Sequence, residues 1–290
     1  MSGNTAPRMK SEAGLLDIWR RLRKNPLAMF GLFIVVLLIF FAITADVIAP
    51  YKYYEQNLIN SFQSPSKEHL FGTDEFGRDI LSRIIHGSRI SLQVGLIAVG
   101  ISVIFGGFFG AVAGYYGGRI DNLIMRGMDI LLSIPSILLA IAIAASLGPG
   151  LYNMMVAVGI STTPQYARII RGSVLSLRGQ EFVEAAKAVG SSDTRIIMKH
   201  ILPNCLAPII VQSTLGVASA ILTAAGLSFI GLGIQPPTPE WGAMLSGGRE
   251  YIRDYAYMTV FPGLAIMITI LALNFLGDGL RDVLDPKLKR

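Results

Sequence analysis

Five stretches of this chain contain no charged residue, and they lie at residues 28–45, 90–118, 130–167, 201–239 and 255–277. A helix needs roughly 20 mostly apolar residues to cross the hydrocarbon core of a bilayer. Only 15% of all residues are charged, whereas a soluble domain carries about 25%. The pattern excludes an ordinary water-soluble protein and predicts an all-α, polytopic membrane protein.

The uncharged stretches divide into six predicted transmembrane helices. The first, at residues 28–49, is too long for the core of a secretory signal and lacks a convincing cleavage site. The stretch at 130–167 contains the turn sequence Ser146-Leu147-Gly148-Pro149-Gly150, so we expect two spans joined by a tight hairpin there. The remaining three spans are expected within residues 90–118, 204–233 and 255–277.

The basic residues predict an orientation for these spans. Six spans place both termini on one side, and that side receives 18 of the 25 Lys and Arg residues, against 7 on the other. Cytoplasmic segments carry the excess of Lys and Arg, so both termini are assigned to the cytoplasm. The predicted organisation is a cytoplasmic tail (1–27), the first span (28–49), an extracytoplasmic loop (50–89), a five-helix transmembrane domain (90–280) and a cytoplasmic tail (281–290).

Within the first tail, Ile18, Trp19 and Leu22 recur at helical spacing among arginines. This pattern predicts a short helix that lies in the cytoplasmic interface. A disordered basic tail is the alternative.

The cytoplasmic loop at about 179–203 has a pattern of its own. Its first part reads as a helix that ends at Gly190, since glycine readily adopts the left-handed conformation after a helix C-terminus. Ser192 or Asp193 can cap a second helix, which Pro203 is expected to end. The loop is therefore predicted to be a helix-turn-helix. By itself, such a hairpin could also be a solvated protrusion without a partner.

The loop contains Glu184-Ala185-Ala186, then Gly190, then Ile201-Leu202-Pro203. This pattern resembles the EAA loop of the permease subunits of bacterial ABC importers. In that family the loop docks on cytoplasmic ATPase subunits. The resemblance thus implies a docking role for Glu184, Ala185, Ala186, Gly190, Leu202 and Pro203, with small alanines allowing close approach and Glu184 facing a partner cation.

Three further motifs narrow the resemblance. They are Phe71-Gly72-Thr73-Asp74-Glu75-Phe76-Gly77-Arg78-Asp79, the segment from Gly231 to Gly242, and the segment from Asn274 to Pro286. They are similar to segments of the "C"-type permease of dipeptide, oligopeptide and nickel importers, and with the first span they cover nearly the whole chain. The implied fold is that of a type I ABC importer permease with six transmembrane helices.

The sequence offers no catalytic site. The nearest match to a phosphate-binding loop, Gly72-x4-Gly77, is followed by Arg78-Asp79 and lies in the extracytoplasmic loop, where cytoplasmic ATP cannot reach it. The single Cys205 and the three scattered histidines predict no metal site. No cofactor is expected in this chain, and ATP and Mg are expected in partner subunits.

Three sets of residues within the spans have candidate roles. Gly106, Gly110, Gly114 and Gly118 recur every four residues, which predicts a helix-packing face, with flexibility during transport as the alternative. Gln212, Ser219 and Thr223 form a weakly polar stripe that either packs helices or lines a translocation pathway. Ser161 and Thr162, beside Pro164, are a second candidate for the pathway, because freed backbone groups there need a neighbour or water.

The resemblance implies a subunit that forms half of a pathway for di- or oligopeptides in the bacterial inner membrane and works by alternating access. Its implied partners are a second, homologous permease, two ATPases and an extracytoplasmic solute-binding protein, in contact with lipid and without nucleic acid. Import of nickel, another metal chelate or glutathione is the alternative. A stand-alone channel or secondary transporter would need ionisable groups near the midplane, which the spans lack.

Overall fold

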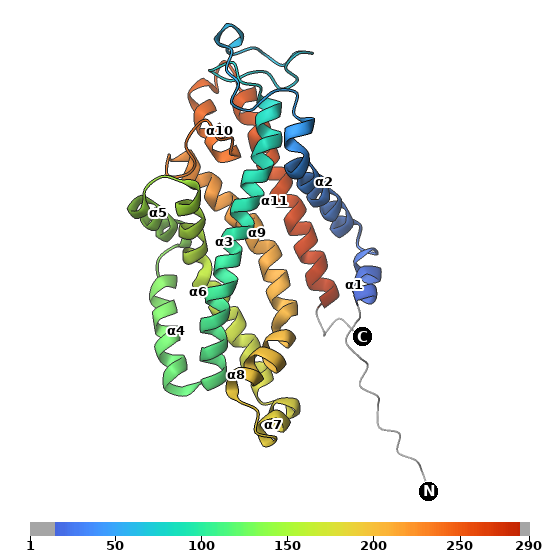
Figure 1. Ribbon diagram of the computed structural model, residues 1–290, viewed down its shortest axis with the longest axis vertical. Helices are drawn as coiled ribbons and strands as arrows, with labels where there is room; N and C mark the ends of the chain where they lie inside the picture. The colour runs from blue at the N-terminus through green and yellow to red at the C-terminus, as the bar shows by residue number, and fades with distance from the viewer. Residues whose placement is uncertain (1–14, 285–290) are drawn as a thin grey trace.

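The computed structural model describes residues 15–284, and this part of the chain is mainly helical, with no β-strand among the described residues. Residues 1–14 of the predicted N-terminal tail and residues 285–290 of the C-terminal tail lie outside the described residues. Long helices run side by side along the molecule (Figure 1). They are α2 (Pro26–Ile48), α3 (Ile80–Tyr116), α6 (Leu151–Arg178), α9 (Leu206–Phe229) and α11 (Tyr257–Leu284).

Among the described residues, four helical segments are long and apolar enough to cross a membrane: α2, α3, the run at 193–229 that contains α9, and α11. A fifth span is possible if α4 (Gly118–Leu132) and α5 (Ser136–Leu147), bent by 87°, are taken as one. α6 has 28 residues but is more polar, and it packs along the bundle against α3. The six predicted spans fall on α2, α3, the bent pair, α6, α9 and α11, and a membrane-spanning role of α6 stays a prediction, because its composition alone does not qualify it.

The structure corrects the third span. The 12 residues of α5 rise only about 18 Å, less than the roughly 30 Å of hydrocarbon thickness. The chain instead begins its return at Gly118, in a segment that the sequence predicts as a loop, and turns sharply at Ser133 to Pro135. Pro135 lacks the N–H that would continue α4, so the helix breaks there.

The structure also shifts the second span. α3 begins at Ile80, so the last ten residues of the predicted extracytoplasmic loop (50–89) are helical. Asp79 starts this helix, because its carboxylate accepts the backbone N–H of Ser82 at 2.8 Å. α3 has 37 residues and extends about 55 Å along the bundle, from the end with the 49–79 segment toward the end with α7 (Figure 1).

The outward face of α2 is apolar. Asn25 caps this helix and Pro26 is its first residue, a position where a missing N–H costs nothing. Phe33, Ile43 and Val47 are 63%, 71% and 86% exposed. The other face packs against α11 and α3, so the exposed apolar side chains are placed to contact lipid.

Glycines bring α3 and α6 close together. A β-carbon on Gly106 would lie 2.6 Å from Cβ of Tyr166, one on Gly114 would lie 2.8 Å from Cβ of Val174, and one on Gly110 would collide with the carbonyl of Ala167. These three glycines form a packing face, as their spacing predicts. Gly118 is not part of it, because it starts α4 with φ +53° and has open space around it.

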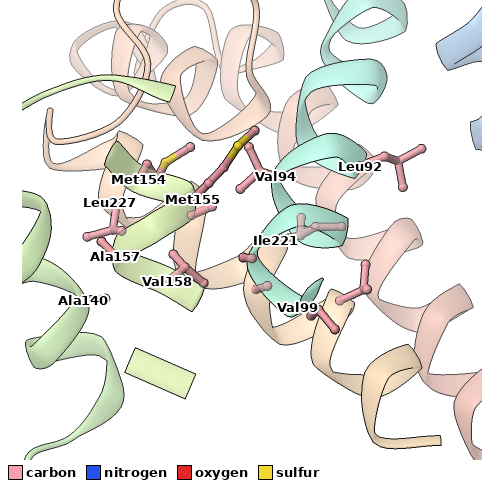
Figure 2. Close-up of a cluster of buried hydrophobic side chains, with 14 of the residues drawn as sticks. Leu92, Val94, Val99, Ala140, Met154, Met155, Ala157, Val158, Ile221 and Leu227 are labelled. Carbon is pink, nitrogen blue, oxygen red and sulfur yellow. The ribbon is translucent and has the colours of Figure 1, made fainter. Parts of the chain in front are cut away.

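The main apolar core lies between α3, α5, α6 and α9. Figure 2 shows Val94 and Val99 of α3, Met155 and Val158 of α6, and Ile221 of α9 in this cluster. Alanines at facing positions, including Ala140 of α5, are fully buried. The core fixes the positions of α6 and α9, which carry the sequence-predicted loop and stripe.

The two ends of the bundle differ. At one end lie α1 (Leu15–Leu22), the C-terminal end of α11, and the hairpin that contains α7 (Glu181–Ala188) and α8 (Asp193–Ile196) (Figure 1). The opposite end carries the 49–79 segment with its short 3-10 helix (Leu58–Asn60), α10 (Trp241–Gly248) and the 3-10 turn Arg249–Tyr251. The described ends of the chain thus share one end of the molecule with the hairpin.

Candidate functional site: the docking hairpin and the bundle around it

The 179–203 loop contains the predicted turn between two helices. α7 ends at Ala188, and Gly190 follows with φ +78°. Its N–H donates to the carbonyl of Lys187 at 2.9 Å, and the N–H of Ser191 donates to Ala186 at 3.1 Å. These two bonds form a Schellman motif, in which a left-handed glycine satisfies the last carbonyls of the helix.

The second arm of the hairpin continues further than predicted. The sequence predicts an end at Pro203, but α8 passes through a π-helical segment (Ile197–Ile201) and a 3-10 turn (Leu202–Cys205) directly into α9. The wider π turn and the tighter 3-10 turn keep the chain helical although Pro203 has no backbone N–H to donate. The hairpin is therefore joined to α9 by continuous helical backbone.

An apolar cluster fastens the hairpin to the bundle. Val183 and Ala186 of α7 and Ile196 of α8 pack with Ala111 of α3 and Ile170 of α6, and all of them are buried. The hairpin is thus a folded part of the bundle and not a solvated appendage.

Exposure divides the sequence-predicted docking residues into two sets. Glu184, Ala185, Gly190 and Pro203 are exposed, and Val189 beside the turn is 80% exposed. Ala186 is only 7% exposed and Leu202 is half-buried, because both face the apolar cluster. The expectation that Ala186 offers a surface to a partner is therefore corrected: its small side chain lets α7 approach its own bundle.

The polar stripe on α9 is partly accessible. Ser219 is exposed, and Gln212 and Thr223 are half-buried. The hydroxyl of Thr223 donates to the carbonyl of Ser219 at 2.9 Å, and that of Ser219 donates to Leu215 at 3.4 Å. The hydroxyls therefore need no partner from another helix, and the stripe can face another chain or water.

Ser161 and Thr162 face the interior of this chain. α6 continues through Pro164 without a break. The hydroxyl of Ser161 donates to the carbonyl of Val158 at 2.9 Å, and that of Thr162 lies 2.7 Å from the hydroxyl of Ser102 on α3. Thr162 thus joins α6 to α3, whereas Ser161 bonds back to its own helix. The pathway role given to both residues stays a prediction.

The opposite end contains a buried polar network that was not predicted from the sequence. Asp74 pairs with Arg78, with Oδ2 and Nε 2.6 Å apart, and Asp79 pairs with His69, with Oδ1 and Nδ1 2.9 Å apart. Arg83 donates to the carbonyls of Tyr53 at 3.1 Å and Pro237 at 3.3 Å. The motif that could be misread as a phosphate loop is thus a turn that caps α3 and ties two outer segments together.

Glu240 belongs to the same end. It is 2% exposed and its two carboxylate oxygens accept the N–H groups of Gly242 and Ala243 at 2.9 and 2.8 Å. Burial raises the pKa of Glu240 above its ordinary value despite these donors. Its role is to cap α10, next to Trp241, whose indole N–H donates to Ile84 of α3 at 3.1 Å.

Residues 15–284 contain no group of three or more His, Cys, Asp and Glu residues placed to hold a metal ion. Cys205 is fully buried in the hairpin cluster. The bundle therefore has an exposed hairpin at one end and, at the other, the buried polar network around Asp74, Asp79 and Arg83, which we call the polar cap.

Comparisons with known proteins agree with this architecture. Residues 106–290 match the family model of the binding-protein-dependent transport system inner membrane component, and residues 15–65 match the N-terminal transmembrane domain of oligopeptide transport permease C. The fold is similar to that of a chain of the inward-facing methionine ABC transporter MetNI, with a TM-score of 0.56 and 19% identity over 69% of this chain and 96% of that one.

Three relatives match nearly the whole chain. A dipeptide transport system permease of Alkalihalophilus pseudofirmus is 54% identical, covering 94% of this chain and 90% of the relative. A di/tripeptide permease of Pseudomonas aeruginosa is 46% identical, covering 98% and 95%. A glutathione permease of Escherichia coli is 48% identical, covering 94% and 90%. The chain therefore belongs to the family of binding-protein-dependent transport system inner membrane components, and it is a polytopic ABC importer permease of the type I fold.

Proposed function

We propose that this permease imports dipeptides or short oligopeptides. The observation that carries the substrate class is the identity of 54% with a dipeptide permease and 46% with a di/tripeptide permease, each over nearly the full length. The matched length includes α9, where Gln212, Ser219 and Thr223 are the accessible polar residues of the proposed pathway.

The second part of the proposal is the orientation. The end that carries α1, the hairpin and the end of α11 faces the cytoplasm, because Lys and Arg are concentrated in those segments. The exposed face of α7, with Glu184 and Ala185, and the Gly190 turn then meet two cytoplasmic ATPase subunits, which hold ATP and Mg. The polar cap at the other end meets an extracytoplasmic binding protein.

The third part is the mechanism. A single chain offers too few accessible polar residues to enclose a peptide, so a second, homologous permease completes the pathway. ATP-driven closure of the ATPases displaces the docked hairpins, and the continuous helical connection from α8 to α9 carries that displacement into the stripe-bearing helix. The bundles then rock between outward-open and inward-open states.

Glutathione is the second candidate substrate, since a glutathione permease is 48% identical to this chain. Glutathione is itself a small peptide, and the same pathway chemistry suits both. A nickel or other metal chelate is a third candidate that rests on the sequence motifs alone.

The experiment is reconstitution of the complete transporter with its binding protein in vesicles, followed by uptake of radiolabelled dipeptide, glutathione and nickel chelate in parallel. We expect ATP-dependent dipeptide uptake that a non-hydrolysable nucleotide does not support. Uptake of glutathione or the chelate in the absence of dipeptide uptake would contradict the peptide assignment.

A further inference from the structure

Tyr115, the second-last residue of α3, contacts both arms of the docking hairpin. Its hydroxyl donates to Oδ1 of Asp193, the first residue of α8, at 2.7 Å. Nζ of Lys187, in the last turn of α7, lies 5.4 Å from the centre of the Tyr115 ring, within the range of a cation–π contact. Tyr115 is only 7% exposed and belongs to the apolar cluster under the hairpin.

The same turn of α3 is also held from α6. Arg178, the last residue of α6, donates through Nη1 to the carbonyls of Gly114 at 3.4 Å and Tyr115 at 3.3 Å. Carbonyls in the last turn of a helix have no partner within that helix, so a guanidinium there is well placed. The helix that leads into the hairpin and both arms of the hairpin therefore contact the last turn of α3.

α3 connects this turn to the opposite end of the molecule. Its first turn contains the Asp79 cap and Arg83, which join it to the outer segments. Apolar packing between hairpin and bundle has no preferred direction, whereas the bond from Tyr115 to Asp193 fixes one register between α3 and α8.

We propose that Tyr115 is a positioning residue for energy coupling, which fastens the docking hairpin to the end of α3 so that displacement of the hairpin also moves α3. This inference rests on the proposed ATP-driven function and adds a second route, beside the α8–α9 connection, by which the hairpin acts on the bundle.

The test uses the complete transporter, with its ATPases and binding protein, in vesicles. Tyr115→Phe keeps the ring and removes only the hydroxyl. We expect normal co-purification of the ATPases and near-normal ATP hydrolysis, with dipeptide uptake per ATP reduced about fivefold, the effect of roughly one net hydrogen bond on an equilibrium. Asp193→Ala should reduce the ratio similarly, the double variant should be no worse, and Asp193→Asn, which keeps an acceptor oxygen, should stay near wild type.

The matched control is Tyr116→Phe, at the neighbouring tyrosine that is 47% exposed. An unchanged uptake-to-ATP ratio in Tyr115→Phe, or an equal loss in Tyr116→Phe, would overturn the inference. Loss of the assembled complex in Tyr115→Phe would also overturn it, because the contact would then be purely structural. Wild-type uptake that needs no ATP would instead refute the proposed function.

Discussion

At the scale of single residues, Gly179 and Gly190 of the loop differ in their backbone conformation. Gly190 has φ +78° in the turn after α7, while Gly179, at the end of α6, has φ −95°. A β-carbon added at either position would have no neighbour within 4 Å, so only backbone conformation distinguishes the two glycines. The left-handed turn at Gly190 was predictable, because that glycine follows a helical pattern. The predicted cap of α8 is not formed: Ser192 is the N-cap without a side-chain capping bond, and the Asp193 carboxylate accepts from Tyr115 instead.

Substituting Gly190 by Ala should therefore disturb the hairpin through backbone strain alone. A left-handed conformation costs a residue with a β-carbon roughly 1–2 kcal/mol. We expect Gly190→Ala to insert normally but to lower uptake several-fold, measured per inserted permease in membrane vesicles. Gly179→Ala is the control and should transport like wild type; equal activity of the two variants would show that the turn geometry is not required.

At the scale of helices, the sequence predicted the elements better than their breaks. The uncharged runs identified α2, α3, α9 and α11, because lipid exposure demands apolar residues over a whole helix. Pro135 and Pro203 had opposite effects: the first breaks the α4–α5 pair, and the second sits within continuous helical backbone. Which outcome a proline has depends on whether surrounding helices hold the chain on course, and that is a property of the packed bundle.

The packing of α3 on α6 gives a prediction at this scale. Gly110→Ala would place a methyl group against the carbonyl of Ala167, whereas the β-carbon of a Gly107→Ala variant would lie 3.7 Å from Ile170, in ordinary contact. Overfilling a tight contact costs roughly 1–3 kcal/mol. Thermal inactivation of the purified complex should shift to lower temperature for Gly110→Ala and much less for Gly107→Ala. A larger shift for Gly107→Ala would contradict this account of the interface.

The stripe on α9 separates a packing role from a pathway role. Ser219 is exposed, while Ala218 beside it is 2% exposed. We expect Ser219→Phe to slow dipeptide uptake while the complex assembles and hydrolyses ATP, and Ala218→Phe to reduce the amount of assembled complex. If Ser219→Phe also prevents assembly, the stripe is a helix contact and not part of the pathway.

At the scale of the whole molecule, the sequence predicted the division into two ends but not the contacts that close them. The motif at 71–79 was recognised only by resemblance. The hydrogen bond from Arg83, which follows that motif, to Pro237 joins segments 154 residues apart, and a sequence pattern does not reveal a contact between such distant segments. The docking role of the hairpin residues stays a prediction, and the burial of Ala186 became visible only once α7 lay against α3 and α6.

The orientation can be tested by thiol labelling. Ser64, in the 49–79 segment, and Ser192, in the turn between α7 and α8, are both exposed. These two segments lie at opposite ends of the bundle (Figure 1). In a Cys205→Ser background, Ser64→Cys should react with an impermeant maleimide in cells whose inner membrane is intact and accessible, and Ser192→Cys should react only after that membrane is opened. The reverse pattern would place the hairpin outside the cytoplasm and refute the proposed coupling.

The most direct measurement of the central claim, that the exposed face of α7 couples this permease to ATPases, is transport by a Glu184→Lys variant. Glu184 is exposed in this chain, and reversing its charge should weaken ATPase binding, with the largest effect if the partner's cation is desolvated in the complex. Co-purification of the ATPases, ATP hydrolysis and dipeptide uptake are measured together, with Glu181→Lys, an exposed charge reversal three residues earlier on α7, as the control. The account predicts loss of ATPase association and uptake in Glu184→Lys beyond any loss in Glu181→Lys; normal association with full ATP-driven uptake would contradict it.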